Sequence, residues 1–430
     1  MANFFTPKKR QNKQVFQCQL NDLDIHGQGV GRWQQRVVFV AGGLPGETVQ
    51  VQAMIPSTGP SKGPLKGQLK NISKASEFRQ AAPCPHYQHC GGCQLQHLQA
   101  DKQIEYKQQA LQRMLAKVGV TIEQWQPAIH SPSDLGYRTK ARLALDVRNR
   151  VKLGFRHQER QTVVPISQCP ILAEPLQQII EPLQQLLGQL SAASQVGHIE
   201  LQLHQQRAAV WLHRQGVWSS ADQHVLDQWS AEHNVQLLVQ DAELSYSLDD
   251  FGVSIHYRRN HFIQSNQQVN ERMVAQAIDW LQLSGTETVL DLFCGAGNFS
   301  LPLATKAAKV VGVEGVADMV TQAKQNAARN QLANIDFFQA DLTQRLDLQP
   351  WWQPVDIIVL DPARAGAQAV VEQLPHCRAG KVLYISCNPT TLVRDAAILQ
   401  GHGYHAEKAG VMDMFPHTHH LESMILFSKN

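Results

Sequence analysis

The chain has 430 residues, of which 17% are charged and 43% are hydrophobic, and its formal net charge is +3. This composition excludes an intrinsically disordered chain, and no apolar run reaches the roughly eighteen residues that cross a membrane. The length predicts two or three domains, and the first residues lack the apolar core of a signal peptide, so we expect a cytoplasmic protein outside the membrane.

The N-terminal part is predicted to be a basic tail followed by a small barrel. Residues 1–14 contain four basic residues and no acidic one, which is typical of a flexible tail. Residues 15–75 contain short β-rich segments separated by glycine turns, a pattern that favours a small β-barrel of the OB type. The turns Gly27–Gly31 and Leu44–Glu47 resemble those of the TRAM module, an RNA-binding barrel. The lysines that follow favour RNA binding, with a solvated basic face as the alternative.

Residues 76–265 are expected to form a central mixed α/β domain that contains a metal site. Three cysteines, Cys84, Cys90 and Cys93, lie within ten residues, and Cys169 is followed by a proline. In a reducing compartment such cysteines are more typical of metal ligands than of disulfides. A distant Cys-Pro is a common last ligand of an iron–sulfur cluster. Zinc remains the alternative, because four cysteines bind either metal.

The same central region contains a basic strand. Residues 137–160 contain eight basic residues and two acidic ones, and strand alternation places Arg138, Lys140 and Arg142 on one face. Such a row either contacts RNA phosphates or forms a solvated face, and we favour RNA contact. Further elements expected in this region are helices over 97–118 and 175–190 and strands over 198–203, 208–212 and 235–239.

From residue 266 onward, strands alternate with helices, which predicts a doubly wound α/β sheet. A helix over 269–283 precedes strands over 289–293, 310–314, 335–338, 355–360, 382–387 and 424–427. A Gly-x-Gly turn follows the first strand, and Glu314 ends the second. This spacing is typical of a nucleoside-binding site in which the carboxylate accepts the ribose hydroxyls. Ser300 replaces the third glycine of the dinucleotide motif, which favours S-adenosylmethionine over NAD.

Reactive side chains are predicted at the carboxyl ends of the later strands. Asp341 follows the third strand, where it could contact the adenine, and Asp361 follows the fourth. Cys387 ends the fifth strand, because the Asn388-Pro389 pair forces the chain to turn there. Open α/β sheets place their chemistry at this edge, so Cys387 is a candidate nucleophile, whereas a buried structural thiol is the alternative.

Five short motifs resemble those of the RNA uracil-5-methyltransferase family, and the resemblance covers essentially the whole chain. They are Phe262-Ile263-Gln264-x-Asn266, Asp291-Leu292-Phe293-Cys294-Gly295-x-Gly297, Asp361-Pro362-x-Arg364, Ser386-Cys387-Asn388-Pro389 and His420-Leu421-Glu422-Ser423. The TRAM-like front and the four cysteines are similar to the branch that methylates 23S ribosomal RNA and contains one 4Fe–4S cluster.

The resemblance implies a role for individual residues. Cys387 is expected to be the nucleophile and Glu422 the base, while Asp361 holds the uracil edge or the methyl donor. Contacts to S-adenosylmethionine are implied for Gln264, Phe293, Asn298, Glu314, Asp341 and Asp361. The sequence departs from the family pattern at His419, where a small residue is usual, and at Asp341, where asparagine is expected.

The predicted function is transfer of a methyl group from S-adenosylmethionine to C5 of a specific uridine in 23S ribosomal RNA. A covalent bond between Cys387 and uracil C6 activates the ring in this scheme. We expect the protein to act as a monomer. The alternatives are an RNA cytosine-5 or tRNA uracil-5 methyltransferase, a non-catalytic RNA-binding protein and a cluster-dependent redox enzyme.

Overall fold

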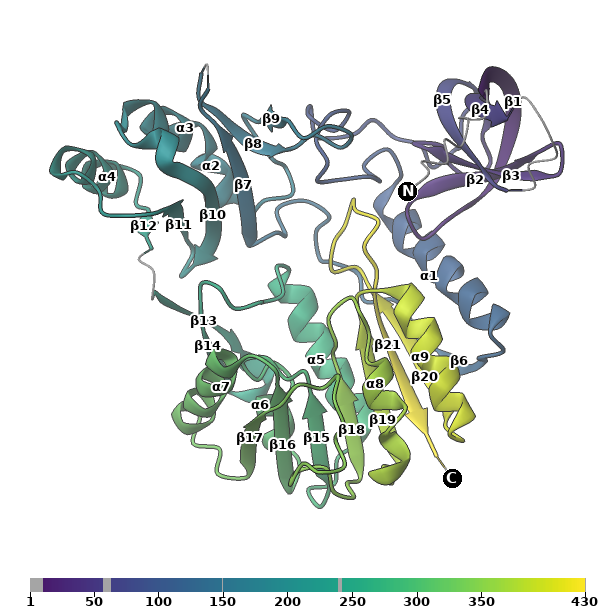
Figure 1. Cartoon of the computed structure of the whole chain (residues 1–430), viewed down its shortest axis with the longest axis vertical. Helices are drawn as coiled ribbons and strands as arrows, with labels where there is room; N and C mark the ends of the chain where they lie inside the picture. Colours follow the sequence, from purple (N-terminus) through teal and green to yellow (C-terminus); the bar gives the residue numbers. More distant parts are fainter. Residues whose placement is uncertain (1–10, 57–62, 149, 239–241, 430) are drawn as a thin grey trace, which may run out of the picture. The chain divides into compact units, whose positions relative to one another are not determined.

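The structure is a computed structural model that describes residues 11–56, 63–148, 150–238 and 242–429 (Figure 1). The chain divides into two compact units. The first contains the chain up to Pro83, together with Cys93–Gln112 and His417–His420. The second contains Cys84–Gly92, Arg113–Pro416 and the chain from Leu421 onward. Residues 1–10 of the predicted tail lie outside the described residues, whereas residues 11–14 begin strand β1.

The first unit contains a closed five-stranded barrel, as the sequence predicts. Its strand order is β1-β2-β3-β5-β4, in which β3 and β5 pair in parallel and the other neighbours are antiparallel. Alternate residues of β1 point inward, so that Phe16, Cys18 and Leu20 are buried together with Val38 and Val51. The strands are β1 (Gln11–Leu23), β2 (Gln28–Trp33), β3 (Arg36–Ala41), β4 (Thr48–Pro56) and β5 (Leu65–Lys74).

A buried ion pair holds the chain where it leaves the barrel. The Glu47 carboxylate is fully buried and accepts hydrogen bonds from Arg79 Nε at 2.6 Å and Arg79 Nη2 at 2.9 Å. The backbone N–H groups of Leu44 and Ser76 also donate to this carboxylate. Helix α1 (Ala100–Lys117) follows in the chain, and its residues up to Gln112 belong to the same unit.

The second unit contains a six-stranded sheet of order β12-β11-β10-β7-β8-β9. Helix α2 packs on β10 and β11, and α3 packs on β8 and α4. The helix predicted over 175–190 is divided into α2 and α3, because Pro182 lacks an N–H donor and disfavours a continuous turn before it. The elements are β7 (Lys140–Asp146), β8 (Lys152–Arg156), β9 (Val163–Pro165), α2 (Glu174–Gln178), α3 (Ile180–Gln189), β10 (Val196–His204), β11 (Arg207–Arg214), α4 (Ser220–Glu232) and β12 (Gln236–Leu237).

The second unit also contains an eight-stranded sheet of order β17-β16-β15-β18-β19-β21-β20-β6. Strands β15 to β19 are parallel, and β21 runs antiparallel between β19 and β20. The predicted doubly wound sheet is therefore present, with an edge strand, β6, from earlier in the chain. Its elements are β6 (Ile122–Trp125), α5 (Gln267–Leu281), β15 (Thr288–Leu292), α6 (Ser300–Ala304), β16 (Lys309–Glu314), α7 (Ala317–Arg329), β17 (Ile335–Gln339), β18 (Ile357–Leu360), α8 (Gln368–Val371), β19 (Lys381–Ser386), α9 (Pro389–Gly401), β20 (His405–Met412) and β21 (Glu422–Ser428).

A hairpin of β13 (Glu243–Leu248) and β14 (Val253–Arg258) is fastened to helix α7 by two asparagines. Asn326 accepts a hydrogen bond from the His256 N–H at 3.1 Å and donates to the His256 carbonyl at 2.8 Å. Asn330 bonds Ser254 in the same two ways, at 2.8 Å each. The side chains thus replace a neighbouring strand and fix the hairpin beside the large sheet.

None of the described helices combines the length and the apolar character needed to cross a membrane.

Candidate active site

Two neighbouring strands bring a thiol and a carboxyl group to the same edge of the large sheet. Strand β19 ends at Ser386, which pairs with Ser423 of the antiparallel strand β21. Cys387 follows the first of these residues and Glu422 precedes the second, so the register places Cys387 opposite Glu422. Cys387 is half-buried, and Glu422 is only 4% exposed. The strand pairing therefore unites the predicted nucleophile and the predicted base.

The turn after β19 exposes the Cys387 position. Asn388 caps helix α9, since its side chain accepts a hydrogen bond from the Thr390 N–H at 3.1 Å, and Pro389 is the first helical residue. The Asn388 amide also donates to the Arg364 carbonyl at 2.8 Å. This bond ties the cysteine turn to the loop that contains Asp361 and Arg364.

The glycine turn after β15 approaches the second strand of the sheet closely. Gly295 donates its N–H to Glu314 Oε2 at 3.2 Å, and Gly297 has φ of +103°. A Cβ atom on Gly297 would lie 3.0 Å from Leu301, so a larger residue would be strained there in both backbone and packing. Phe293 also adopts a left-handed conformation, with φ of +67°. The turn thereby exposes backbone to a ligand beside Glu314.

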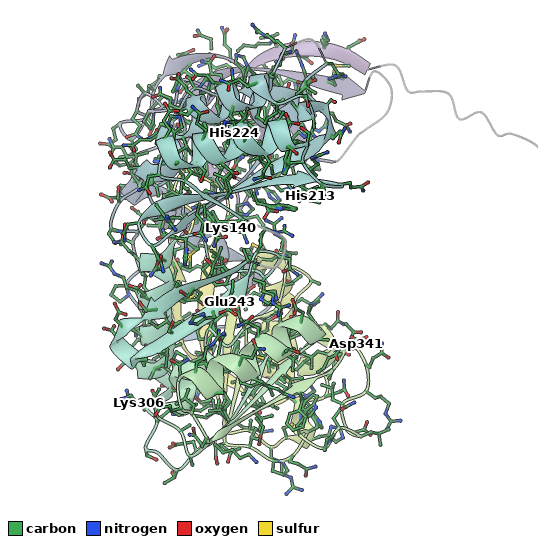
Figure 2. All side chains as sticks on the ribbon, turned by 90° about the vertical axis from the view of Figure 1, so that its left-hand side faces the viewer. Lys140, His213, His224, Glu243, Lys306 and Asp341 are labelled. Atoms are coloured by element: carbon green, nitrogen blue, oxygen red, sulfur yellow. The ribbon has the colours of Figure 1, made fainter. Side chains whose placement is uncertain are left out.

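Residues from these turns surround one cavity of about 400 Å³. Seven of the predicted site residues line it: Gln264, Phe293, Asn298, Glu314, Asp361, Cys387 and Glu422. Asp341 is not among the described residues that line it. This residue is exposed, lies at the surface in Figure 2, and its carboxylate accepts hydrogen bonds from the Thr343 N–H and hydroxyl.

Burial and mutual repulsion govern the ionisation of the reactive groups. Burial raises the pKa of Asp361 to about 7, and burial together with repulsion from Asp361 raises the pKa of Glu422 well above its usual range. Burial also raises the pKa of Cys387 to about 11, assisted by Glu422 and Asp361, while Arg364 opposes the shift for both Cys387 and Glu422. A cationic ligand in this cavity would favour the ionised form of all three groups.

Comparison with known proteins agrees with this geometry. The model of the tRNA (Uracil-5-)-methyltransferase family matches residues 99–430. The chain belongs to this family. It is 42% identical to the 23S rRNA (uracil(1939)-C(5))-methyltransferase RlmD of Shewanella amazonensis over 99% of both chains, and 41% identical to that of Shewanella baltica over the same shares.

A solved structure has the same fold as this family member. It is the tRNA (uracil-54, C5)-methyltransferase of Pyrococcus abyssi in complex with S-adenosyl-L-homocysteine. The TM-score is 0.73 at 22% identity, and the match covers 96% of the present chain and all of the other. The likeness confirms the predicted fold class, a methyltransferase sheet preceded by a small closed barrel.

The three predicted RNA-contact residues differ in their surroundings. Arg142 is exposed, and its Nη2 lies 3.1 Å from His198 Nδ1. Lys140, labelled in Figure 2, donates from Nζ to the carbonyls of Arg259 and His261 at 3.2 Å each, and burial lowers its pKa. Arg138 Nε donates to the Lys140 carbonyl at 2.9 Å. RNA contact by these residues remains a prediction, and Arg142 is the one best placed for it.

Of the four predicted metal ligands, Cys90, Cys93 and Cys169 are buried and Cys84 is half-buried. Three of them, Cys84, Cys90 and Cys169, belong to the second unit, and Cys93 belongs to the first. Burial raises the pKa of Cys90, and repulsion from Cys84 adds to this shift. Among the described residues, no three Cys, His, Asp or Glu side chains are arranged to hold a metal ion. The cluster therefore remains a prediction.

Other cavity residues received no role from the sequence alone. Tyr246 comes from the β13–β14 hairpin, and its hydroxyl donates to Asn298 Oδ1 at 2.9 Å. Nothing in its local sequence marks it as a site residue, because its position depends on how the hairpin packs against α7 and the core of the large sheet. Phe262 and Arg364 lie in recognised motifs, and the structure places both in the cavity lining. Phe262 is 71% exposed, so its ring is open to a large substrate.

Proposed function

We propose that this chain methylates C5 of a uridine in 23S ribosomal RNA with S-adenosylmethionine as the donor. The observation that carries the proposal is the strand register that sets Cys387 opposite Glu422 in the cavity that also contains Asp361. The names of its relatives specify uracil 1939 of 23S rRNA, which is the nucleotide we assign.

The first half of the reaction requires the Cys387 thiolate. Uracil C5 is too weak a nucleophile to accept a methyl group directly, whereas addition of sulfur to C6 turns C5 into an enolate carbon. That carbon attacks the methyl group of the donor, and the neutral thioether S-adenosylhomocysteine leaves. Asp361 lies in the same cavity, where the positive charge of the donor favours its ionised form, so its carboxylate can accept a hydrogen bond from the uracil N3–H.

The second half of the reaction requires a base. C5 now bears both a methyl group and its original proton, and the enzyme remains covalently bound until that proton is removed. Glu422 takes the proton, the C5–C6 double bond re-forms, and the Cys387 sulfur leaves. The high pKa of Glu422 suits this step, because a carboxylate with a raised pKa is a stronger base once ionised.

The remaining cavity residues are assigned to the donor. Gln264 Oε1 is buried and, among the described residues, has no hydrogen-bond partner. It can therefore accept a hydrogen bond from the amino group of S-adenosylmethionine. Glu314 is placed to accept the ribose hydroxyls, and Phe293 and Asn298 line the same space. Contact between Asp341 and the adenine is part of the proposal, although in the present structure its carboxylate bonds within its own loop.

The assignment is tested with the Cys387→Ala variant and an in vitro transcribed 23S rRNA fragment that contains the target. We expect loss of labelled-methyl transfer and of the covalent adduct with 5-fluorouridine-substituted RNA. Cys377→Ala is the matched control, because Cys377 is buried outside the cavity and should retain both activities. Methyl transfer by Cys387→Ala at the wild-type rate would refute the role of this thiol.

The substrate alternatives are separated by the RNA supplied. Cytosine-5 methylation also uses a thiolate at C6, so RNA labelled at uracil or at cytosine distinguishes the two reactions. Transfer RNA in place of the ribosomal fragment tests the tRNA uracil-5 alternative. Absence of methyl transfer to any of these RNAs, despite binding, would identify a non-catalytic RNA-binding protein.

A 4Fe–4S cluster held by Cys84, Cys90, Cys93 and Cys169 is part of the proposal, and the local structure fits thiolate ligands. The Gly92 N–H donates to Cys90 Sγ at 3.4 Å. Burial raises the pKa of Cys84, and backbone groups of His86 and Tyr87 oppose that shift by favouring the thiolate. When bound, the cluster would fasten these segments of chain together. Iron and sulfide analysis after anaerobic purification tests it against zinc.

The remaining organisation is proposed on the same basis. We assign residues 15–75, together with residues 11–14 of strand β1, to a TRAM-like RNA-binding barrel, 76–265 to a central domain and 266–430 to the methyltransferase domain. Action as a monomer and a cytoplasmic location complete the proposal. Sedimentation of the purified protein tests the first, and cell fractionation tests the second.

A further inference from the structure

The loop that leads into the predicted base is held by its main chain at His417. The His417 N–H donates to Gln103 Oε1 at 2.7 Å, and its carbonyl accepts hydrogen bonds from the Gln94 and Leu95 N–H groups at 2.9 Å each. His417 and Gln103 are both completely buried. All of these residues belong to the first unit, although His417 lies only five positions before Glu422 in the sequence.

The Gln103 amide uses both of its ends in this arrangement. Its Nε2 donates to the Leu98 carbonyl at 2.7 Å and to the Leu95 carbonyl at 3.2 Å, and lies 3.0 Å from His417 Nδ1. Two carbonyl oxygens surround one terminal atom of the Gln103 amide, and a backbone N–H faces the other. The first must therefore be the amide nitrogen and the second the amide oxygen. Because an amide nitrogen only donates, His417 Nδ1 is the acceptor in this contact.

The backbone of His417 shows that these bonds impose a conformation. Its φ is +67°, in the left-handed region that residues with a side chain adopt only when the surroundings enforce it. The residues that follow are also fixed: Thr418 Oγ1 accepts the His420 N–H at 3.2 Å, and His419 Nδ1 lies 3.0 Å from Gln94 Oε1. The main chain from His417 to His420 is therefore held in one conformation.

We propose that Gln103 is a positioning residue for the elimination step, because it fixes the loop that delivers Glu422. The inference rests on the proposed function, in which Glu422 removes the C5 proton. Strand pairing fixes Glu422 from its C-terminal side, since Ser423 pairs with Ser386. The Gln103 bonds fix it from the N-terminal side. Without them, Gln94 and Leu95 still hold the His417 carbonyl, but the His417 N–H loses its Gln103 acceptor. We expect the segment that leads into Glu422 to loosen while Cys387, on another strand, keeps its place.

The test separates the two halves of the reaction in the full-length protein. Gln103→Met keeps the size of the side chain and removes its hydrogen bonds. An rRNA fragment substituted with 5-fluorouridine forms a covalent adduct with Cys387 that persists, because the fluorine at C5 cannot be removed as a proton. The amount of this adduct therefore gives the number of enzyme molecules with a competent thiol. Release of tritium from [5-³H]uridine in the same fragment then measures elimination per competent site.

We expect Gln103→Met to form the fluorouridine adduct at a rate within about twofold of wild type, since the thiol does not move. Elimination per competent site should fall on the order of 100-fold, the effect of a small misplacement of a catalytic group. The variant should also accumulate a covalent complex with ordinary uridine RNA. A loss of fold alone would lower the number of sites and leave the rate per site unchanged.

Two further variants complete the test. Gln109→Met is the matched control on the same helix. The Gln109 amide donates to exposed Glu105 at 3.3 Å, and the variant should behave as wild type. Gln103→Glu retains the acceptor for the His417 N–H and loses the amide donor, so we expect a defect in elimination between those of wild type and Gln103→Met. If Gln103→Met yields no competent sites, Gln103→Glu takes its place in the test. Wild-type elimination per site in both Gln103 variants overturns the inference. If wild-type protein itself shows no methyl transfer, the proposed function fails instead.

Discussion

The ionisation of Cys387 in the ligand-free protein gives a direct test of the site electrostatics. Its pKa is raised from the ordinary 9.0 to about 11 by burial and by the two neighbouring carboxyl groups. A shift of about two units lowers the thiolate fraction about 100-fold at pH 8, from roughly one in ten to one in a thousand. The donor adds a positive charge to the same cavity. At about 5 Å and an effective dielectric of about 20, a unit charge is worth about 3 kcal/mol, or about two pKa units.

The assay is alkylation by iodoacetamide, quantified at the Cys387 peptide by mass spectrometry between pH 7 and pH 11. Because only the thiolate reacts, the rate should rise tenfold per pH unit up to about pH 11 in the free protein. Sinefungin, which has an ammonium group in place of the sulfonium, should raise the rate at pH 8, whereas neutral S-adenosylhomocysteine should not. Arg364→Gln should lower the rate in the free protein, because Arg364 stabilises the thiolate.

A rate in the free protein that reaches its plateau below pH 9 would refute this account of the site. Equal effects of sinefungin and S-adenosylhomocysteine would refute activation by the charge of the donor. Arg345→Gln is the control for Arg364→Gln, because Arg345 forms an exposed ion pair with Asp347 and does not line the cavity.

Three further predictions concern other parts of the molecule. Glu422→Gln should form the covalent complex with ordinary uridine RNA but release it at least about 100-fold more slowly, as measured by denaturing gel, and rapid release would remove the base role. Arg79→Ala should lower the free energy of unfolding by about 3 kcal/mol at pH 7 by leaving the Glu47 carboxylate buried without its partner. Burial alone would raise the pKa of Glu47, but the bonds from Arg79, Leu44 and Ser76 lower its pKa overall. The stability that the ion pair contributes is therefore present above pH 4.5 and is lost as the pH falls further. Equal losses of unfolding free energy in Arg79→Ala at pH 7 and pH 4, measured by calorimetry, would contradict this account. Cys169→Ser should reduce iron and sulfide per chain in anaerobically purified protein, and an unchanged content would exclude Cys169 as a ligand.

The fold and the centre of the site were largely predictable, because both follow local rules of chain geometry. The glycine turn after β15 and the Asn-Pro turn after β19 each mark a strand end. In a parallel sheet these ends meet at one edge. Cys387, Asp361 and Glu314 could therefore be placed together from the sequence alone.

Other features depend on contacts between distant segments and could not be predicted. Tyr246 reaches the cavity because its hairpin is bonded to Asn326 and Asn330 and packs into the core of the large sheet. Nothing in the local sequence of either asparagine indicates this contact. Strand alternation gives the face on which Lys140 lies, but it does not reveal that Lys140 Nζ donates to the carbonyls of Arg259 and His261. Periodicity gives the face of a strand, and it does not say what else packs there.

The return of His417–His420 to the first unit has a consequence for how such an enzyme can be divided. A fragment that begins after Gln112 keeps Cys387, Asp361 and Glu422 but lacks Gln94, Leu95 and Gln103, to which the His417 main chain is hydrogen-bonded. Such a fragment could retain the thiol and the donor site while losing orderly turnover. A chimera that takes its barrel from a relative should therefore be active only when residues 93–112 and the methyltransferase sheet come from the same protein. The junction of such a chimera is best placed between Pro83 and Cys84.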